Sequence, residues 1–134
     1  MKQFFIAYRH TGEDIMELEK RIRTIETALA TKQIKVYATL FDEETFQQNN
    51  LTAGQIMRHA FEKLDSIDGL FVLIMNSSRS EGQLIEIGYA LAKNKQIIVA
   101  RQKDAQTYAH ELTDLVIEFD DLNDLARKIQ ELEL

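Results

Sequence analysis

The chain has 134 residues, which suits one domain, residues 1–134, with a single hydrophobic core. Its net charge of −6 argues against a nucleic-acid partner, whose phosphate backbone attracts basic surfaces. Cysteine is absent and the three histidines are scattered, so we expect no disulfide, no metal site and no cofactor. No apolar run reaches ~18 residues and no signal core follows the first residues, so we expect a cytoplasmic protein without a membrane span.

Short apolar runs alternate with helical patterns along the chain. The predicted strands are short runs of apolar or β-forming residues, at residues 4–8, 35–40, 70–75, 96–100 and 115–119. The predicted helices have apolar side chains at helical spacing, over residues 11 or 12 to 30, 52–65, 81–93 and about 122 onward. Residues 41–51 are mostly polar and indicate an exposed loop between the second strand and the second helix.

This alternation of strands and helices predicts a parallel sheet covered on both faces. The fold class we expect is α/β, a flavodoxin-like three-layer sandwich whose five-stranded sheet has the order 2-1-3-4-5. The order reverses between the first and third strands, which brings the loop of residues 8–12 beside the loop of residues 76–82. Ligands bind open α/β sheets at such a point, so this is the predicted ligand cleft.

Residues 68–92 combine a buried strand, a loop of small polar residues and a helix. Ser80 is the predicted N-cap, and Gly82 allows backbone or ligand to come close at the first helical turn. Glu86 is the one carboxylate among apolar and small neighbours, where burial costs several kcal/mol unless something stabilises the charge. Glu86 therefore either reaches water or a basic partner at the edge of the apolar stripe, or it is a catalytic carboxylate at the mouth of the cleft.

Residues 80–92, followed by the Lys-led apolar run 95–99, resemble the nucleoside 2-deoxyribosyltransferase family. The shared pattern is a small or acidic residue, then Gly, then Glu-x-Gly-x-Ala, with an aspartate before the preceding strand. The resemblance implies that Glu86 is the nucleophile that attacks C1′ of a nucleoside or nucleotide, and that Ser80 contacts sugar or phosphate. It also implies a homodimer, because the related enzymes complete their sites across subunits.

The N-terminal half has a second resemblance. Residues 5–14 and 54–56 are similar to Toll/interleukin-receptor (TIR) domains, and Ser80 and Glu86 would then match the serine and catalytic glutamate of TIR enzymes that cleave NAD. Both families break an N-glycosidic bond through an oxocarbenium-like transition state, with a carboxylate facing C1′ of the ribose. The two resemblances therefore imply one chemistry on different substrates.

The predicted function is cleavage or transfer of the N-glycosidic bond of a nucleoside or nucleotide through a ribosyl ester on Glu86. A carboxylate suits this role because we expect it to stay ionised at neutral pH. We expect Tyr8 to orient Glu86 or stack on the ligand, and Arg9 to meet a phosphate. The full set of predicted substrate contacts, all near the two loops, is Tyr8, Arg9, His10, Gly12, Asn76, Ser78, Ser80 and Gly82.

Two positions depart from the first family's pattern. Ala60 stands where the family usually has an aspartate, and Leu115 where it often has an asparagine near the final strand. Without that aspartate, His10, His59 or water must protonate the leaving base. The alternative function is therefore a nucleotide-binding or protein-interaction module that keeps the fold and lacks part of the site.

Overall fold

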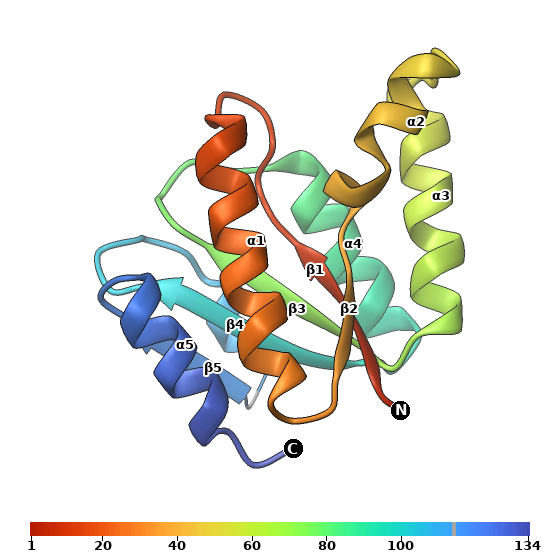
Figure 1. The fold of residues 1–134 in the computed structure, drawn as a ribbon. Helices are drawn as coiled ribbons and strands as arrows, with labels where there is room; N and C mark the ends of the chain where they lie inside the picture. The colour runs from red at the N-terminus through yellow and green to blue at the C-terminus, as the bar shows by residue number, and fades with distance from the viewer. Residues whose placement is uncertain (114) are drawn as a thin grey trace.

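A five-stranded parallel sheet of order β2-β1-β3-β4-β5 crosses the centre of the computed structural model, which describes residues 1–113 and 115–134 (Figure 1). Every neighbouring pair of strands is parallel, which confirms the predicted fold class and strand order. The strands are β1 (Gln3–Ala7), β2 (Lys35–Tyr37), β3 (Gly69–Ile74), β4 (Gln96–Gln102) and β5 (Leu115–Phe119).

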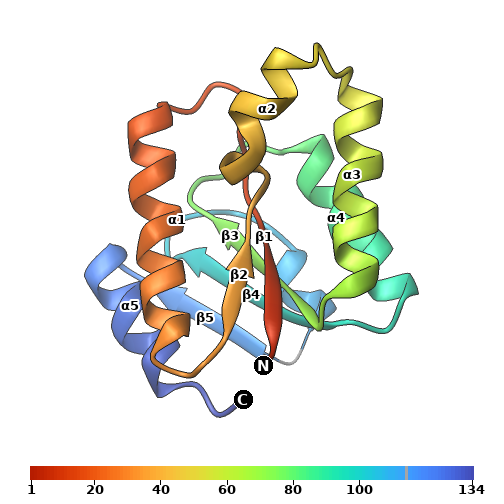
Figure 2. The ribbon, with the colours of Figure 1, turned by 45° about the vertical axis from the view of Figure 1, so that its right-hand side comes forward.

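Helices cover both faces of the sheet. α1 (Ile15–Ala30) and α5 (Leu122–Glu131) lie together on one face, and α3 (Ala53–Ser66) and α4 (Glu81–Ala92) lie on the other (Figure 2). Three short helical segments lie in the connections: η1 (Thr39–Asp42), α2 (Glu43–Gln48) and η2 (Ala109–Leu112). None of the helices in the described ranges is long and apolar enough to cross a bilayer.

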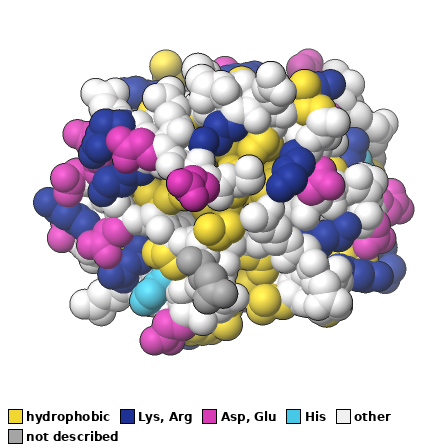
Figure 3. All heavy atoms as spheres, turned by 90° about the horizontal axis from the view of Figure 1, so that it is seen from below, with side chains coloured by type: hydrophobic (Ala, Val, Ile, Leu, Met, Phe, Trp, Pro, Cys, Tyr) yellow, Lys and Arg dark blue, Asp and Glu magenta, His cyan; other side chains and the backbone are white. Residues whose placement is uncertain are grey.

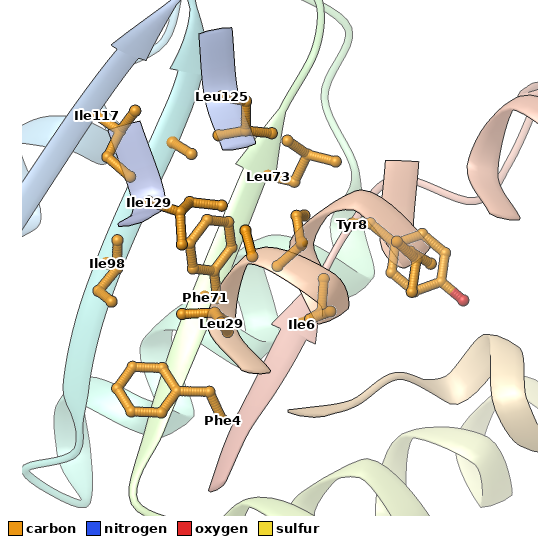
Figure 4. Packing of buried hydrophobic residues seen from close by; sticks show 14 of the residues in the cluster. Phe4, Ile6, Tyr8, Leu29, Phe71, Leu73, Ile98, Ile117, Leu125 and Ile129 are labelled. Atoms are coloured by element: carbon orange, nitrogen blue, oxygen red, sulfur yellow. The ribbon is translucent and has the colours of Figure 1, made fainter. Parts of the chain in front are cut away.

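The continuous apolar run of β3 places it in the middle of the core, because all six of its residues are buried. Its side chains alternate between two hydrophobic clusters, as the pleat of a strand requires. Phe71 and Leu73 pack toward α1 and α5 (Figure 4). Leu70 and Val72 pack toward α3 and α4. Gly69 begins the strand where a Cβ would approach the backbone oxygen of Gln96 to 2.7 Å, so the tight packing there excludes any side chain.

The capping residues set the helix boundaries. Asp14 caps α1 by accepting a hydrogen bond from the Met16 amide at 2.8 Å, so the helix begins at Ile15 and not at Thr11 or Gly12. Gly12 has a positive φ of 79°, which does not fit a helix and explains the later start. The predicted cap of α3 is confirmed, since Thr52 and Gln55 form a reciprocal capping box.

The segment after β2 differs from the prediction. The strand expected over residues 35–40 ends at Tyr37, and residues 39–48, expected as part of a strand and an exposed loop, are helical. Apolar contacts explain the difference: Phe46 is 4% exposed with its ring 5.2 Å from the ring of His59 on α3, and Leu40 and Phe41 pack against the core. The segment is therefore held against α3 despite its polar composition.

Figure 3 views the molecule from below, the side on which both chain ends lie in Figure 1. Hydrophobic side chains gather in the middle of this face, and charged side chains of both signs surround them. The carboxyl ends of β1 and β3 lead away from this side, so the predicted cleft lies at the other end of the sheet.

Candidate active site

The candidate site lies where β1 and β3 end side by side. The two strands are paired from Phe4 with Gly69 to Ala7 with Val72, so the loops that follow them leave the same edge of the sheet. The Asn76 amide donates a hydrogen bond to Glu13 Oε1 at 3.2 Å, which joins the two loops directly. The structure therefore has the adjacent loops that the strand order predicts.

The start of α4 is fixed by two side chains. Ser80 is the N-cap, as predicted, and its hydroxyl accepts a hydrogen bond from the Gln83 amide at 3.2 Å. The Gln83 side chain is buried and donates hydrogen bonds to the backbone oxygens of Ala7 at 3.1 Å and Leu73 at 2.7 Å. These bonds tie the first turn of α4 to the ends of both β1 and β3.

Glu86 lines a hollow of about 170 Å³ between the β1 loop, α3 and α4. Five of the predicted site residues meet there, including Glu86 itself: Tyr8, His10, Ser80, Gly82 and Glu86. The other lining residues are Thr11, Thr39, Ile56, Met57, Ala60 and Gln83.

Glu86 is 8% exposed, and its carboxyl forms neither a hydrogen bond nor an ion pair with any described residue. No basic residue among those described pairs with Glu86, so a salt bridge does not account for its position, and its carboxyl opens into the hollow that it lines. Burial raises its pKa from the ordinary 4.5 to about 8. Burial therefore favours the protonated form of Glu86, which runs against the expectation of an ionised carboxylate at neutral pH.

Tyr8 approaches the hollow from the end of β1. Its hydroxyl group pairs with Thr39 Oγ1 at 3.1 Å, and burial raises its pKa to about 12. Figure 4 shows the hydroxyl directed away from the aliphatic side chains around it. Tyr8 therefore contacts the site without a hydrogen bond to Glu86, so the structure gives no direct sign that it orients the carboxyl. Thr39 was missed in the sequence because the residue was assigned to a strand.

A second, larger hollow of about 400 Å³ lies on the other side of the α4 N-terminus. Ser80 and Gln83 line both hollows, so the two adjoin. The larger one contains the predicted contacts Asn76 and Ser78, which do not line the hollow of Glu86. Its far wall is residues 106–109, a segment that carried no recognisable motif in the sequence and was not predicted as part of a site.

Arg9 and Gly12 lie apart from Glu86. Arg9 Nη1 forms an ion pair with Glu13 Oε1 at 3.1 Å, and Arg21 approaches the other carboxylate oxygen at 3.6 Å. Burial tends to raise the pKa of Glu13, but hydrogen bonds from Asn76 and Arg9 outweigh it and lower the pKa. Gly12 lies against the Arg9 guanidinium and lines neither hollow. The charge of Arg9 is thus already matched by a carboxylate.

The two positions that depart from the family pattern have different surroundings. Ala60 lines the hollow of Glu86, so this wall is apolar at the position where the family usually has an aspartate. Leu115 begins β5 and pairs with Ile98, away from both hollows. His59 is occupied elsewhere, since its Nε2 lies 2.9 Å from the Tyr37 hydroxyl and 3.4 Å from an Asp42 oxygen.

Solved structures share this fold over nearly their whole length. A CMP N-glycosidase from Clostridium botulinum is similar with a TM-score of 0.68 and 21% identity, over 96% of this chain and 97% of that chain. A 2-deoxyribosyltransferase from Bacillus psychrosaccharolyticus has a TM-score of 0.65 and 15% identity, over 98% and 93%. A conserved protein from Enterococcus faecalis V583 has a TM-score of 0.67 and 16% identity, over 98% of each chain.

At sequence identities this low, the similar structures establish only a shared fold. The family is assigned by comparison of the sequence with family models. No curated protein matches the chain. The family model of nucleoside 2-deoxyribosyltransferase matches residues 12–125, which include α1, β3 and the whole of α4. The chain therefore belongs to the nucleoside 2-deoxyribosyltransferase family.

Proposed function

We propose that the protein cleaves or transfers the N-glycosidic bond of a nucleoside or nucleotide, with Glu86 as the nucleophile. One observation carries the proposal: a buried carboxyl without a described partner lines a hollow at the switch point of the sheet. Membership of the nucleoside 2-deoxyribosyltransferase family supports it, as does the fold shared with a CMP N-glycosidase.

The reaction we propose has two steps. The Glu86 carboxylate attacks C1′ while the bond from C1′ to the base nitrogen breaks, which leaves a glycosyl ester on Glu86 and releases the base with its bonding electrons. Water, or a second base, then attacks C1′ and regenerates the carboxylate. Burial helps the first step, because a carboxylate without a water shell gains more from the positive charge that develops at C1′.

The departing base needs a proton, and the hollow offers few donors. The wall formed by Ile56, Met57 and Ala60 is apolar. Tyr8 is a weak acid, since burial raises its pKa to about 12. His10 lines the hollow and is exposed to solvent, so we propose that His10 or a water molecule protonates the base.

The size of the two hollows suggests how a substrate is divided between them. The hollow of Glu86 is smaller than most ligand pockets, and the adjoining hollow of about 400 Å³ lies within the usual range. We place the sugar at Glu86, Ser80 and Gly82, and the rest of the substrate in the larger hollow with Asn76 and Ser78. Arg79 lines the larger hollow, and the other residues that line it include no carboxylate, so Arg79 replaces Arg9 as the proposed phosphate contact.

We further propose that the protein is a homodimer that associates through the outer face of α4. Leu84, Ile85 and Leu91 are 39%, 47% and 41% exposed, although they are large aliphatic residues. Gly88 lies on the same outer face, where a Cβ would meet open space, so a second helix can approach closely. Light scattering at high concentration should give twice the chain mass of 15.5 kDa, and a monomer mass would refute the dimer.

Base release from a panel of substrates tests the proposed function. The panel contains nucleosides, 2′-deoxynucleosides, their 5′-monophosphates and NAD, with and without a second base as acceptor. We expect release from at least one nucleoside or monophosphate by the wild-type protein, and loss of several orders of magnitude in Glu86→Gln. Activity on NAD alone would favour the TIR-like function, and activity on none would favour the binding module.

A further inference from the structure

Gln83 stands beside Glu86 as the other buried polar side chain among the described residues, and each is 8% exposed. The two residues are three positions apart on α4, so they lie on the same side of the helix. Gln83 lines both the hollow of Glu86 and the larger hollow. It therefore stands where the two parts of a substrate would meet.

The orientation of the Gln83 amide is fixed by its hydrogen bonds. Nε2 has two hydrogens, and it donates to the backbone oxygens of Ala7 and Leu73, at the ends of β1 and β3. A rotated amide would place Oε1 against two carbonyl oxygens, which repel it. The side chain therefore presents Oε1, and only Oε1, to a further partner.

Gln83 Oε1 accepts no hydrogen bond from the residues that the structure describes. Among the described residues, the fully buried side-chain atoms without a hydrogen-bond partner are Arg101 Nε and His110 Nδ1. Gln83 Oε1 is not among them, so this unpartnered oxygen is not fully buried. The oxygen is therefore open to the hollows that Gln83 lines. An acceptor held in this way selects a ligand group that donates a hydrogen bond.

We infer that Gln83 Oε1 accepts a hydrogen bond from a hydroxyl group of the substrate sugar, and that Gln83 is a specificity-determining residue. This inference rests on the proposed function, which places the sugar at Glu86. The sugar hydroxyls are its only hydrogen-bond donors, and one face of the hollow, formed by Ile56, Met57 and Ala60, offers them no acceptor side chain. Gln83, one helical turn before Glu86, supplies one.

The test measures binding in the Glu86→Gln protein, which cannot consume the ligand. The probes are cytidine 5′-monophosphate and its 2′-deoxy and 3′-deoxy analogues, with Kd measured by calorimetry. We expect one deoxy analogue to bind about 10- to 100-fold more weakly than the parent nucleotide, because it leaves a desolvated acceptor unpaired. In Glu86→Gln/Gln83→Leu, the parent and that analogue should bind within about twofold of each other.

A purely structural role for Gln83 predicts a different pattern. The Gln83→Leu change would then weaken all three nucleotides by the same factor and leave their ratio unchanged, which would overturn the inference. If Gln83→Leu does not fold, Gln83→Met removes the same acceptor with an unbranched side chain of similar length. The Glu86→Gln protein, which retains Gln83, gives a second check. Equal affinity of this protein for the three nucleotides, or no binding of any of them, would also overturn the inference.

Failure of the proposed function is distinguishable from failure of this inference. The wild-type protein could release no base and still show a hydroxyl preference that depends on Gln83. This result would refute the proposed enzyme activity and support the role of Gln83 in specificity. The protein could instead release base in a way that depends on Glu86 and bind the three nucleotides equally well. This result would support the proposed activity and refute the role of Gln83.

Discussion

Replacing Glu86 by glutamine should stabilise the folded chain, and the gain should grow with pH. In the fold, burial raises the pKa of Glu86 from 4.5 to about 8. Between these values the unfolded chain has an ionised Glu86 and the folded chain a protonated one, so folding takes up a proton and stability falls as pH rises. The loss of folding free energy is complete above about pH 8. It reaches about 2 to 5 kcal/mol, and the upper figure corresponds to the full difference between the two pKa values.

Thermal unfolding of both proteins from pH 4 to pH 9 measures this effect. Glutamine has nearly the same shape and no charge, so the Tm difference should be small near pH 4 and increase through neutral pH. For a chain of 134 residues, about 3–4 °C per kcal/mol gives a difference of roughly 6–20 °C at pH 9. Groups other than Glu86 contribute equally to both proteins at each pH. A Tm difference that is constant with pH would refute the buried, protonated Glu86.

Three further predictions concern the same region. Because Glu86 must be ionised to attack C1′, kcat/KM should rise with pH on the acid side of its optimum, and it should fall again at higher pH if His10 rather than water protonates the base; a profile without a rising acid side would contradict the nucleophile role. Arg79→Ala should raise KM for a 5′-monophosphate about tenfold and leave the nucleoside unaffected, whereas the control Arg9→Ala should not distinguish the two substrates. Ile85→Lys should shift the dimer toward monomer in light scattering with little change in Tm, since Ile85 is 47% exposed; an unchanged dimer would move the interface elsewhere.

The sequence was sufficient for the fold because its strongest patterns are local. The uninterrupted apolar run of β3 and the caps Thr52 and Ser80 are visible in the sequence, and the βα alternation then leaves few strand orders. The segment after β2 was predicted wrongly because a few apolar contacts, of Leu40, Phe41 and Phe46, hold ten mostly polar residues in helical form. A contact of that kind depends on tertiary packing and leaves no periodic signal.

The candidate site was predictable only in part. Glu86, Ser80 and Gly82 belong to one motif, and helix geometry places them together in the structure. Arg9 was a poor candidate because its partner Glu13 lies four residues away in a loop, and loop contacts have no fixed spacing. Gln83 was overlooked because its role depends on two backbone oxygens from separate strands, which no sequence pattern records.

The most direct test of the account is to locate a sugar bound covalently to the protein. A 2′-fluoroarabinosyl analogue of the best substrate slows both steps, and the second step can then be slower than the first, so the ester accumulates. After quenching and digestion with trypsin, mass spectrometry of the peptide Ser80–Lys93 gives the position of the sugar, and fragmentation separates Glu86 from Glu81. The account predicts the sugar on Glu86. A sugar on another residue, or turnover of the analogue with no sugar on the protein, would contradict it.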